Sequence, residues 1–292
     1  MPFPADQLGL RLRPKVSDIS IRSILAYAAG VGASDAAYLD DAQDGGLRAL
    51  PFQCVSLEWP VLVSMRHALA AALSPEEARR GVHAMQDSTF HRPIRPGDRL
   101  VTEGQLVAVR PLRAGAFTLC RLITRDRDSG GPVTTTWTSS IYRDVALDGE
   151  AGSLAEPPAL APDDARSPGP GAEETLIPIP RQMPHVYSEC ADIWNPIHTE
   201  RQVALAAGLP DIILHGTATW ALAGLTLLRR YARDNVGALQ RITGQFSGMV
   251  LAGEPITVRH ERRASGAITF EVRTASGATA IRQGAAWLTP GG

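Results

Sequence analysis

The segment from Thr217 to Leu228 constrains the fold of this chain more than any other, because it is apolar almost all the way round. It reads TATWALAGLTLL and is followed by Arg229 and Arg230. A helix on a protein surface keeps a polar face, and this segment offers almost none before the arginines. We therefore predict a helix from Thr217 to about Ala232 that the rest of the protein encloses.

Antiparallel strands are predicted after this helix, and again in the first half of the chain. β-Branched residues, alternating polarity and glycine turns favour them. The expected strands are residues 83–94, 100–109, 117–125 and 133–142 in the first half, and 241–250, 256–263, 268–274 and 279–288 in the second. A long helix from about Leu57 to Leu73 precedes the first set, so both halves follow one plan.

The shared plan indicates an internal duplication. Each half has a short helix, a long apolar helix and then strands, and Tyr27 in the first half corresponds to Tyr187 in the second. Residues 148–172 are rich in proline, glycine, alanine and acidic residues without periodicity, which is typical of a linker. We predict an amino-terminal domain over residues 1–147, a linker over 148–172 and a carboxy-terminal domain over 173–292.

The composition indicates a soluble globular protein whose partner is a small molecule. Apolar residues make up 44% of the chain and the net charge is −1, so neither nucleic acid nor an anionic membrane surface is favoured. The three cysteines are scattered without zinc-site spacing, which indicates reduced thiols and no metal site. The first 15 residues lack a signal-peptide core and no apolar run approaches the roughly 18 residues of a membrane span, so we expect a cytoplasmic protein.

A candidate for chemistry is His198, in the sequence Asn195-Pro196-Ile197-His198. Asn195 is a favourable N-cap and Pro196 fits the first helical position, so a helix is predicted from Pro196 to about Ala207, ended by Gly208. His198 then lies in the first turn, where the positive end of the helix dipole disfavours imidazolium. A neutral imidazole can act as a base.

A second candidate is Gly216, which opens the predicted buried helix. A glycine there points a bare backbone N–H at its surroundings, an arrangement suited to a developing oxyanion. We interpret His215, the preceding residue, as a buried histidine before a required glycine.

The blocks Asn195-Pro196-Ile197-His198 and Ile213-Leu214-His215-Gly216 together resemble the motif of the MaoC-like dehydratases, the (R)-specific enoyl-CoA hydratases also called hydratase 2. The separation of the two histidines matches the family, and two blocks at that spacing are specific where Asn-Pro-x-His alone is weak. The segment Tyr27–Ser34 also resembles one found in the first half of paired-half members. As in those proteins, the first half here has no Asn-Pro-x-His.

The resemblance implies an α+β fold, a tandem or double hot-dog in which each half is a curled antiparallel sheet around a long central helix. It implies a hydro-lyase that reversibly adds water to a trans-2-enoyl-CoA, giving an (R)-3-hydroxyacyl-CoA, without a metal or other cofactor; coenzyme A is part of the acyl-CoA thioester substrate. His198 and Asp192 are the expected catalytic residues, and Asn195 and Gly216 bind the substrate. Because hot-dog sheets commonly pair edge to edge, we expect a homodimer.

One departure from the family concerns the catalytic aspartate. The family places it five residues before the histidine, where this chain has Ile193, and Asp192 lies six before. One residue is about 100° of helical rotation, so either a one-residue bulge restores Asp192 or the acid–base dyad is incomplete. Asp192 as a capping charge, and His198 as a helix residue with only local hydrogen bonds, are the simpler interpretations. The alternative functions are therefore a non-catalytic acyl-thioester-binding hot-dog protein and a hot-dog thioesterase.

Overall fold

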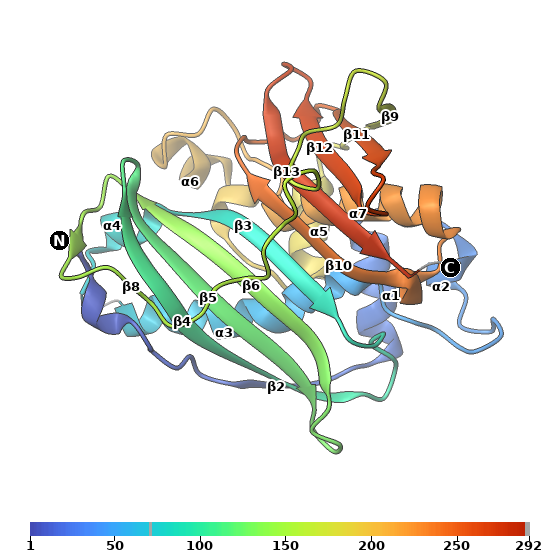
Figure 1. Cartoon of the computed structure of the whole chain (residues 1–292), viewed down its shortest axis with the longest axis horizontal. Coiled ribbons are helices and arrows are strands. Elements are labelled where there is room, and N and C mark those ends of the chain that lie inside the picture. Colours follow the sequence, from blue (N-terminus) through green and yellow to red (C-terminus); the bar gives the residue numbers. More distant parts are fainter. Residues whose placement is uncertain (70–71, 290–292) are drawn as a thin grey trace. The chain divides into compact units, whose positions relative to one another are not determined.

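The computed structural model describes residues 1–69 and 72–289, which form two compact units. Unit 1 consists of residues 1–17, 57–89 and 99–159, and unit 2 of residues 18–56, 90–98 and the described residues from 160 onward. Each unit contains an antiparallel sheet together with helices, as Figure 1 shows. The predicted α+β class is therefore confirmed.

All four strands predicted in the first half are present. They are β3 (Gly81–Phe90), β4 (Arg99–Leu112), β5 (Gly115–Asp126) and β6 (Pro132–Arg143), in the sheet order β2-β4-β5-β6-β3, where β2 is Lys15–Asp18. β1 (Phe3–Pro4) pairs with β7 (Leu147–Asp148), and β8 (Gly152–Ser153) pairs with β4. The strand predicted to reach Ile94 ends at Phe90, because Pro93 has no N–H to donate to a neighbouring strand.

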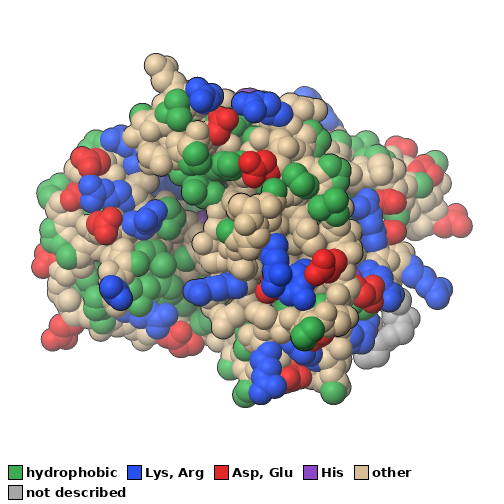
Figure 2. All heavy atoms as spheres, turned by 90° about the horizontal axis from the view of Figure 1, so that it is seen from above, with side chains coloured by type: hydrophobic (Ala, Val, Ile, Leu, Met, Phe, Trp, Pro, Cys, Tyr) green, Lys and Arg blue, Asp and Glu red, His purple; other side chains and the backbone are tan. Residues whose placement is uncertain are grey.

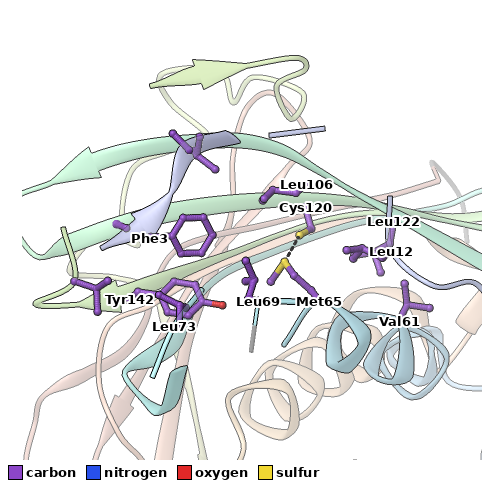
Figure 3. Packing of buried hydrophobic residues seen from close by; sticks show 14 residues of the cluster. Phe3, Leu12, Val61, Met65, Leu69, Leu73, Leu106, Cys120, Leu122 and Tyr142 are labelled. Carbon is purple, nitrogen blue, oxygen red and sulfur yellow. Dashed lines mark hydrogen bonds between the residues drawn. The ribbon is translucent and has the colours of Figure 1, made fainter. Parts of the chain in front are cut away.

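The core of unit 1 lies between this sheet and α3 (Cys54–Leu69), the long helix predicted in the first half. Val61, Met65 and Leu69 recur every fourth residue, so they lie on one face of the helix. Figure 3 shows this face against side chains from the strands, with Met65 Sδ 3.5 Å from Cys120 Sγ. Residues 70 and 71 of the predicted helix lie outside the described residues. The short α4 (Pro75–Arg79) follows, and a 3₁₀ turn, η1 (Ala5–Gln7), lies near the amino terminus.

Unit 2 contains the four strands predicted in the second half. They are β10 (Leu239–Phe246), β11 (Ile256–Arg262), β12 (Ile268–Thr274) and β13 (Thr279–Leu288). Within the unit their order is β10-β13-β12-β11-β9, with every pair antiparallel. The edge strand β9 (Glu173–Ile177) begins inside the carboxy-terminal domain predicted from the sequence, and the pattern did not reveal it.

The helix α7 (Gly216–Ala232) is enclosed as predicted, since every residue from Ala218 to Leu228 is buried. Gly224 is needed in the middle of the helix because the ring of Phe52 occupies the space that a Cβ would take. The helix is followed by a short 3₁₀ turn, η4 (Val236–Ala238), which leads into β10.

The compact units do not follow the two predicted halves, because residues 18–56 group with unit 2. This segment contains α1 (Ile21–Gly30), α2 (Ala36–Leu39) and η2 (Pro51–Gln53), and α1 packs against α5 (Met183–Cys190). The corresponding residues Tyr27 and Tyr187 face each other there, with hydroxyl oxygens 3.5 Å apart. A Cβ on Gly30 would lie 2.6 Å from Cβ of Cys190, so this close approach requires glycine. The domain boundaries at 147 and 173 remain a prediction.

The end of the predicted linker is tied to unit 2 by polar contacts. Asp164 is 5% exposed and accepts a hydrogen bond from Ser265 Oγ at 2.6 Å. Arg259 donates from Nη2 to the carbonyl oxygen of Gly169 at 3.0 Å. These contacts hold the backbone of residues 164–169 in a defined conformation, although the sequence of this segment shows no periodic pattern.

The surface carries charges of both signs. On the face drawn in Figure 2, basic and acidic side chains are interspersed, which agrees with the balanced composition. Among residues 1–69 and 72–289, no helix has the length and apolar character needed to cross a membrane.

Candidate active site

The chain around His198 forms two short helical segments instead of the single predicted helix. A 3₁₀ turn, η3 (Pro196–His198), is separated from α6 (Arg201–Ala206) by Thr199 and Glu200. The carbonyl of Thr199 accepts a hydrogen bond from Nε2 of His185 at 3.0 Å, in place of the N–H that a continuous helix would supply. The prediction of one helix here is therefore wrong, and a contact with α5 supplies the reason.

The structure contradicts the predicted capping by the Asn195 side chain and confirms the predicted conformation of Gly208. Asn195 occupies the N-cap position with φ of −145°, but its side chain makes no capping hydrogen bond, so that part of the prediction is wrong. Gly208 has φ of +77°, the left-handed conformation predicted for it. Because His198 ends a three-residue turn, the helix-dipole argument for its neutrality does not apply to it.

A hydrogen bond from the His198 ring to a backbone carbonyl fixes the position of this side chain. The carbonyl belongs to Ile213, 15 residues further along the chain. The side chain is 9% exposed, and Nδ1 lies 2.8 Å from the carbonyl oxygen of Ile213. A carbonyl oxygen can only accept, so Nδ1 carries the proton and donates it. In the neutral ring Nε2 then holds the lone pair and is the atom able to accept a proton from water.

The segment that binds His198 is itself held by strand-like pairing. Ile213 forms an antiparallel bridge with Leu251, and the N–H of Leu214 donates to the carbonyl of Val250 at 2.8 Å. This pairing fixes the position of the Ile213 carbonyl. The segment then continues directly into α7.

His215 stacks on His198, with ring centroids 3.7 Å apart and planes inclined by 25°. It is 3% exposed, its Nε2 lies 3.2 Å from Ser188 Oγ, and the ring of Tyr187 lies 4.9 Å away. Burial lowers the pKa of His215 well below its usual range, and the neighbouring His198 lowers it further. His215 is therefore a neutral ring in contact with the candidate base, and the sequence pattern alone gave it only a packing role.

Gly216 is the first residue of α7. The first N–H groups of an α-helix have no acceptor within the helix, so they are available to a ligand. A Cβ at this position would lie 3.2 Å from two carbons of the Phe246 ring, which explains why glycine is favoured. One residue further on, Thr217 Oγ1 accepts a hydrogen bond from the Tyr187 hydroxyl at 3.1 Å.

Asp192 lies two residues beyond the end of the helix α5, after the C-cap Ala191. Its φ is 53°, in the left-handed region that follows many helix ends. Its N–H lies 3.4 Å from the carbonyl of Glu189, and the N–H of Ile193 donates to the carbonyl of Ser188 at 3.0 Å. This pair of hydrogen bonds is a Schellman motif, and it gives Asp192 a structural role that the sequence pattern did not indicate.

The register difference at Asp192 is visible in the structure. Ile193, at the position where the family has aspartate, is 4% exposed, whereas Asp192 is exposed. Among residues 1–69 and 72–289, no hydrogen bond or ion pair joins the Asp192 carboxylate to His198. The structure thus brings His198, His215 and the start of α7 together and leaves Asp192 exposed beyond the end of α5.

No group of three or more histidine, cysteine, aspartate or glutamate side chains in the described part of the chain is arranged to hold a metal ion. The hydrogen-bonding groups of the site indicate the chemistry that it can perform. A neutral imidazole can accept a proton, and a free helix N–H can stabilise negative charge on a substrate oxygen.

Two family models match the chain. Residues 177–282 match the MaoC like domain, and residues 6–136 match the FAS1-like, dehydratase domain region. The first match contains η3, the start of α7 and all the residues of the candidate site described above.

Similar proteins agree with these matches. A protein of Mycobacterium tuberculosis named 3-hydroxyacyl-thioester dehydratase Y is 25% identical over 94% of this chain and 93% of its own. The crystal structure of a MaoC-like dehydratase from Phytophthora capsici has a TM-score of 0.82 at 20% identity, covering 97% of this chain and 98% of that one. A second M. tuberculosis protein, described as having a double hotdog fold, has a TM-score of 0.57 at 16% identity, covering 97% and 96%.

The structural similarities confirm the predicted double hot-dog fold. The family matches and the dehydratase relative confirm the resemblance seen in the two sequence blocks, and at family level they support a hydro-lyase acting on acyl thioesters. This chain is similar to the MaoC-like dehydratases, with the MaoC like domain over residues 177–282 and the dehydratase domain region over residues 6–136.

Proposed function

We propose that this protein reversibly adds water to a trans-2-enoyl-CoA and forms an (R)-3-hydroxyacyl-CoA. The observation that carries the proposal is the hydrogen bond from Nδ1 of His198 to the carbonyl of Ile213, which makes Nε2 the proton acceptor and ties the ring to a residue just before the start of α7. The M. tuberculosis relative named a 3-hydroxyacyl-thioester dehydratase supports it, since dehydration is the reverse of the same reaction.

The reaction divides between a base and an oxyanion donor. Nε2 of His198 removes a proton from water, and the water oxygen attacks the β-carbon of the enoyl thioester. The electron pair of the C=C bond moves to the thioester oxygen, where the Gly216 N–H stabilises the negative charge. When the enolate collapses, the α-carbon takes up a proton and the thioester carbonyl is restored.

We assign delivery of the α-carbon proton to Asp192. Its carboxyl group is exposed, so it can take up from solvent the proton that it delivers as a carboxylic acid, and it lies six residues before His198 in the chain. A carboxylic acid positioned at the reacting carbon typically contributes about 10²- to 10⁴-fold to the rate. Asn195, which is partly buried beside η3, is the proposed binding residue for the substrate.

The remaining parts of the proposal follow from the chemistry and from the family resemblance. Water addition needs only proton transfer and charge stabilisation, so no metal or redox cofactor is included and coenzyme A enters as part of the substrate. The (R) configuration, a homodimeric assembly and a cytoplasmic location are proposed from the sequence. Light scattering after size-exclusion chromatography tests the dimer, and chiral analysis of the product tests the configuration.

The decisive experiment follows the absorbance of the enoyl thioester. Wild-type protein should remove the absorbance of short, long or branched trans-2-enoyl-CoA, and His198→Ala should abolish that activity. His67→Ala is a control for the removal of a histidine outside the site, because His67 is an exposed histidine of α3. An inert wild type across all three chain classes contradicts the lyase function.

A second function, binding of an acyl thioester without hydration, is favoured by one observation. The family's aspartate position holds a buried Ile193, and Asp192 has no hydrogen bond to His198 in the part of the chain that is described. In that case acyl-CoA should bind the wild type in calorimetry while the enoyl absorbance stays constant. A thioesterase would instead release free coenzyme A, which a thiol reagent detects.

A further inference from the structure

The backbone hydrogen bond fixes the His198 ring at Nδ1, and a bond to one ring atom does not by itself set the plane of the ring. The bond from Nδ1 to the Ile213 carbonyl is 2.8 Å long. A hydrogen bond to one ring nitrogen lets an imidazole tilt about that bond, and tilting moves Nε2. A base acts efficiently only when its nitrogen points at the proton, so a second kind of contact, one that restrains the ring plane, matters.

The ring of His215 supplies that second contact. It lies against the face of His198, with 3.7 Å between centroids and 25° between planes. This arrangement restricts tilting while it leaves the edge of the His198 ring, and therefore Nε2, uncovered by His215. The acceptor Ile213 and the stacking ring of His215 are two residues apart, so one short segment provides both constraints.

His215 is itself held from several directions. Its Nε2 lies 3.2 Å from Ser188 Oγ on α5, and Tyr187 packs against the ring at 4.9 Å. Its carbonyl accepts hydrogen bonds from both the N–H and the hydroxyl of Thr219, at 3.0 and 3.2 Å, in the first turn of the enclosed helix α7. A ring so constrained is a rigid surface for its neighbour.

We propose that His215 is a positioning residue that sets the plane of the His198 ring and so directs Nε2 toward the water. The proposal rests on the proposed function of His198 as base. Burial favours the neutral form of His215, and a neutral ring can remain stacked when His198 takes up the proton from water, without repulsion between two charges. The ionisable side chains of His198 and Tyr187 lie against the His215 ring.

The test compares His215→Ala with a matched control, His260→Ala. His260 is also buried, at 1% exposed, and its Nδ1 lies 2.9 Å from the hydroxyl of Tyr231, with the two rings 5.4 Å apart. Both substitutions therefore remove a buried histidine that is bonded to a hydroxyl and packed on a tyrosine. The two substitutions differ because His215 stacks on the ring of His198, whereas His260 packs on Tyr231.

We expect His215→Ala to lower kcat by about 10- to 100-fold, with KM changed by less than about threefold, because misplacement of a catalytic group mainly affects the chemical step. His215→Phe, which keeps a flat ring, should recover most of that loss. His260→Ala should lose stability to a similar degree and retain kcat within about threefold. Equal kcat values for His215→Ala and His260→Ala, or no recovery with phenylalanine, would overturn the proposal.

A second measurement separates this proposal from the proposed function. Nitrogen-15 NMR of the imidazole rings should show His198 as a single Nδ1–H form in wild type, and a shifted or broadened signal in His215→Ala. Unchanged His198 signals overturn the positioning role, whether or not the wild type hydrates enoyl thioesters. If His215→Ala does not fold, Ser188→Ala removes only the hydroxyl beside Nε2 and should give the same changes at smaller size.

Discussion

Asp192 combines a backbone role with a proposed chemical role. It adopts φ of 53° at the end of α5 and closes a Schellman motif there. A left-handed residue other than glycine carries a cost of about 1 kcal/mol, which asparagine and aspartate partly reduce through local hydrogen bonding. The same residue is the proposed proton donor.

Substitution with glycine separates these two roles. Asp192→Gly should leave the free energy of unfolding unchanged or raise it by up to about 1 kcal/mol, since glycine adopts this conformation without strain, whereas Asp192→Ala should lower it by about 1 kcal/mol. Urea unfolding measures both. If Asp192 donates the proton, Asp192→Gly and Asp192→Asn should each lower kcat by about 10-fold or more. Full activity in both variants would remove Asp192 from the mechanism.

At the scale of single elements, the start of α7 determines whether a backbone N–H is available to the substrate. The preceding residue, His215, has φ of −58° and ψ of 138°. This extended conformation is the one preferred before proline, and proline is well accepted at the first position of a helix. The N–H of Gly216 can therefore be removed without a change in the backbone path.

Gly216→Pro tests the oxyanion role, with Gly216→Ala as its control. Both add a Cβ near the ring of Phe246, where an atom would lie 3.2 Å from two ring carbons, but only proline removes the N–H. Loss of one oxyanion donor typically lowers kcat by about 10²- to 10³-fold. We expect Gly216→Pro to be slower than Gly216→Ala by about this factor at comparable thermal stability. Equal rates would show that another group stabilises the oxyanion.

At the scale of the whole molecule, buried neutral histidines link stability to pH. Burial lowers the pKa of His83 in unit 1 to about 4, and it lowers the pKa values of His215 and His260 in unit 2. The unfolded chain takes up protons at these residues near the ordinary value of 6.5, where the folded protein does not. Because the unfolded state then binds more protons, acid favours unfolding.

The free energy of unfolding should therefore be constant above about pH 7 and fall as the pH is lowered from about 6.5 to 5. Each histidine can contribute a slope of up to about 1.4 kcal/mol per pH unit. Urea titrations at several pH values measure the slope, and His260→Phe should reduce it. Carboxylates such as Glu173 and Asp211, whose pKa values are lowered, act only in more acidic solution. A flat profile between pH 7 and 5 would contradict this prediction.

The sequence by itself determined the features that depend on neighbouring residues along the chain. The continuous apolar face predicted the enclosed helix α7, and alternation predicted eight strands, all of which are present. Two short blocks predicted the resemblance to the MaoC-like dehydratases and the double hot-dog fold, and the similar proteins confirm both. The left-handed turn at Gly208 was also predictable, because glycine takes this conformation at little cost.

Only the tertiary structure decided how separate segments meet. The bond between His198 and Ile213, the stacking of His198 on His215, and the grouping of Tyr27 with Tyr187 join residues 15, 17 and 160 positions apart. The helix predicted after Asn195 is interrupted because His185 binds the Thr199 carbonyl. Such contacts form only when several elements pack together, and the periodicity of one segment carries no record of the partner it will meet.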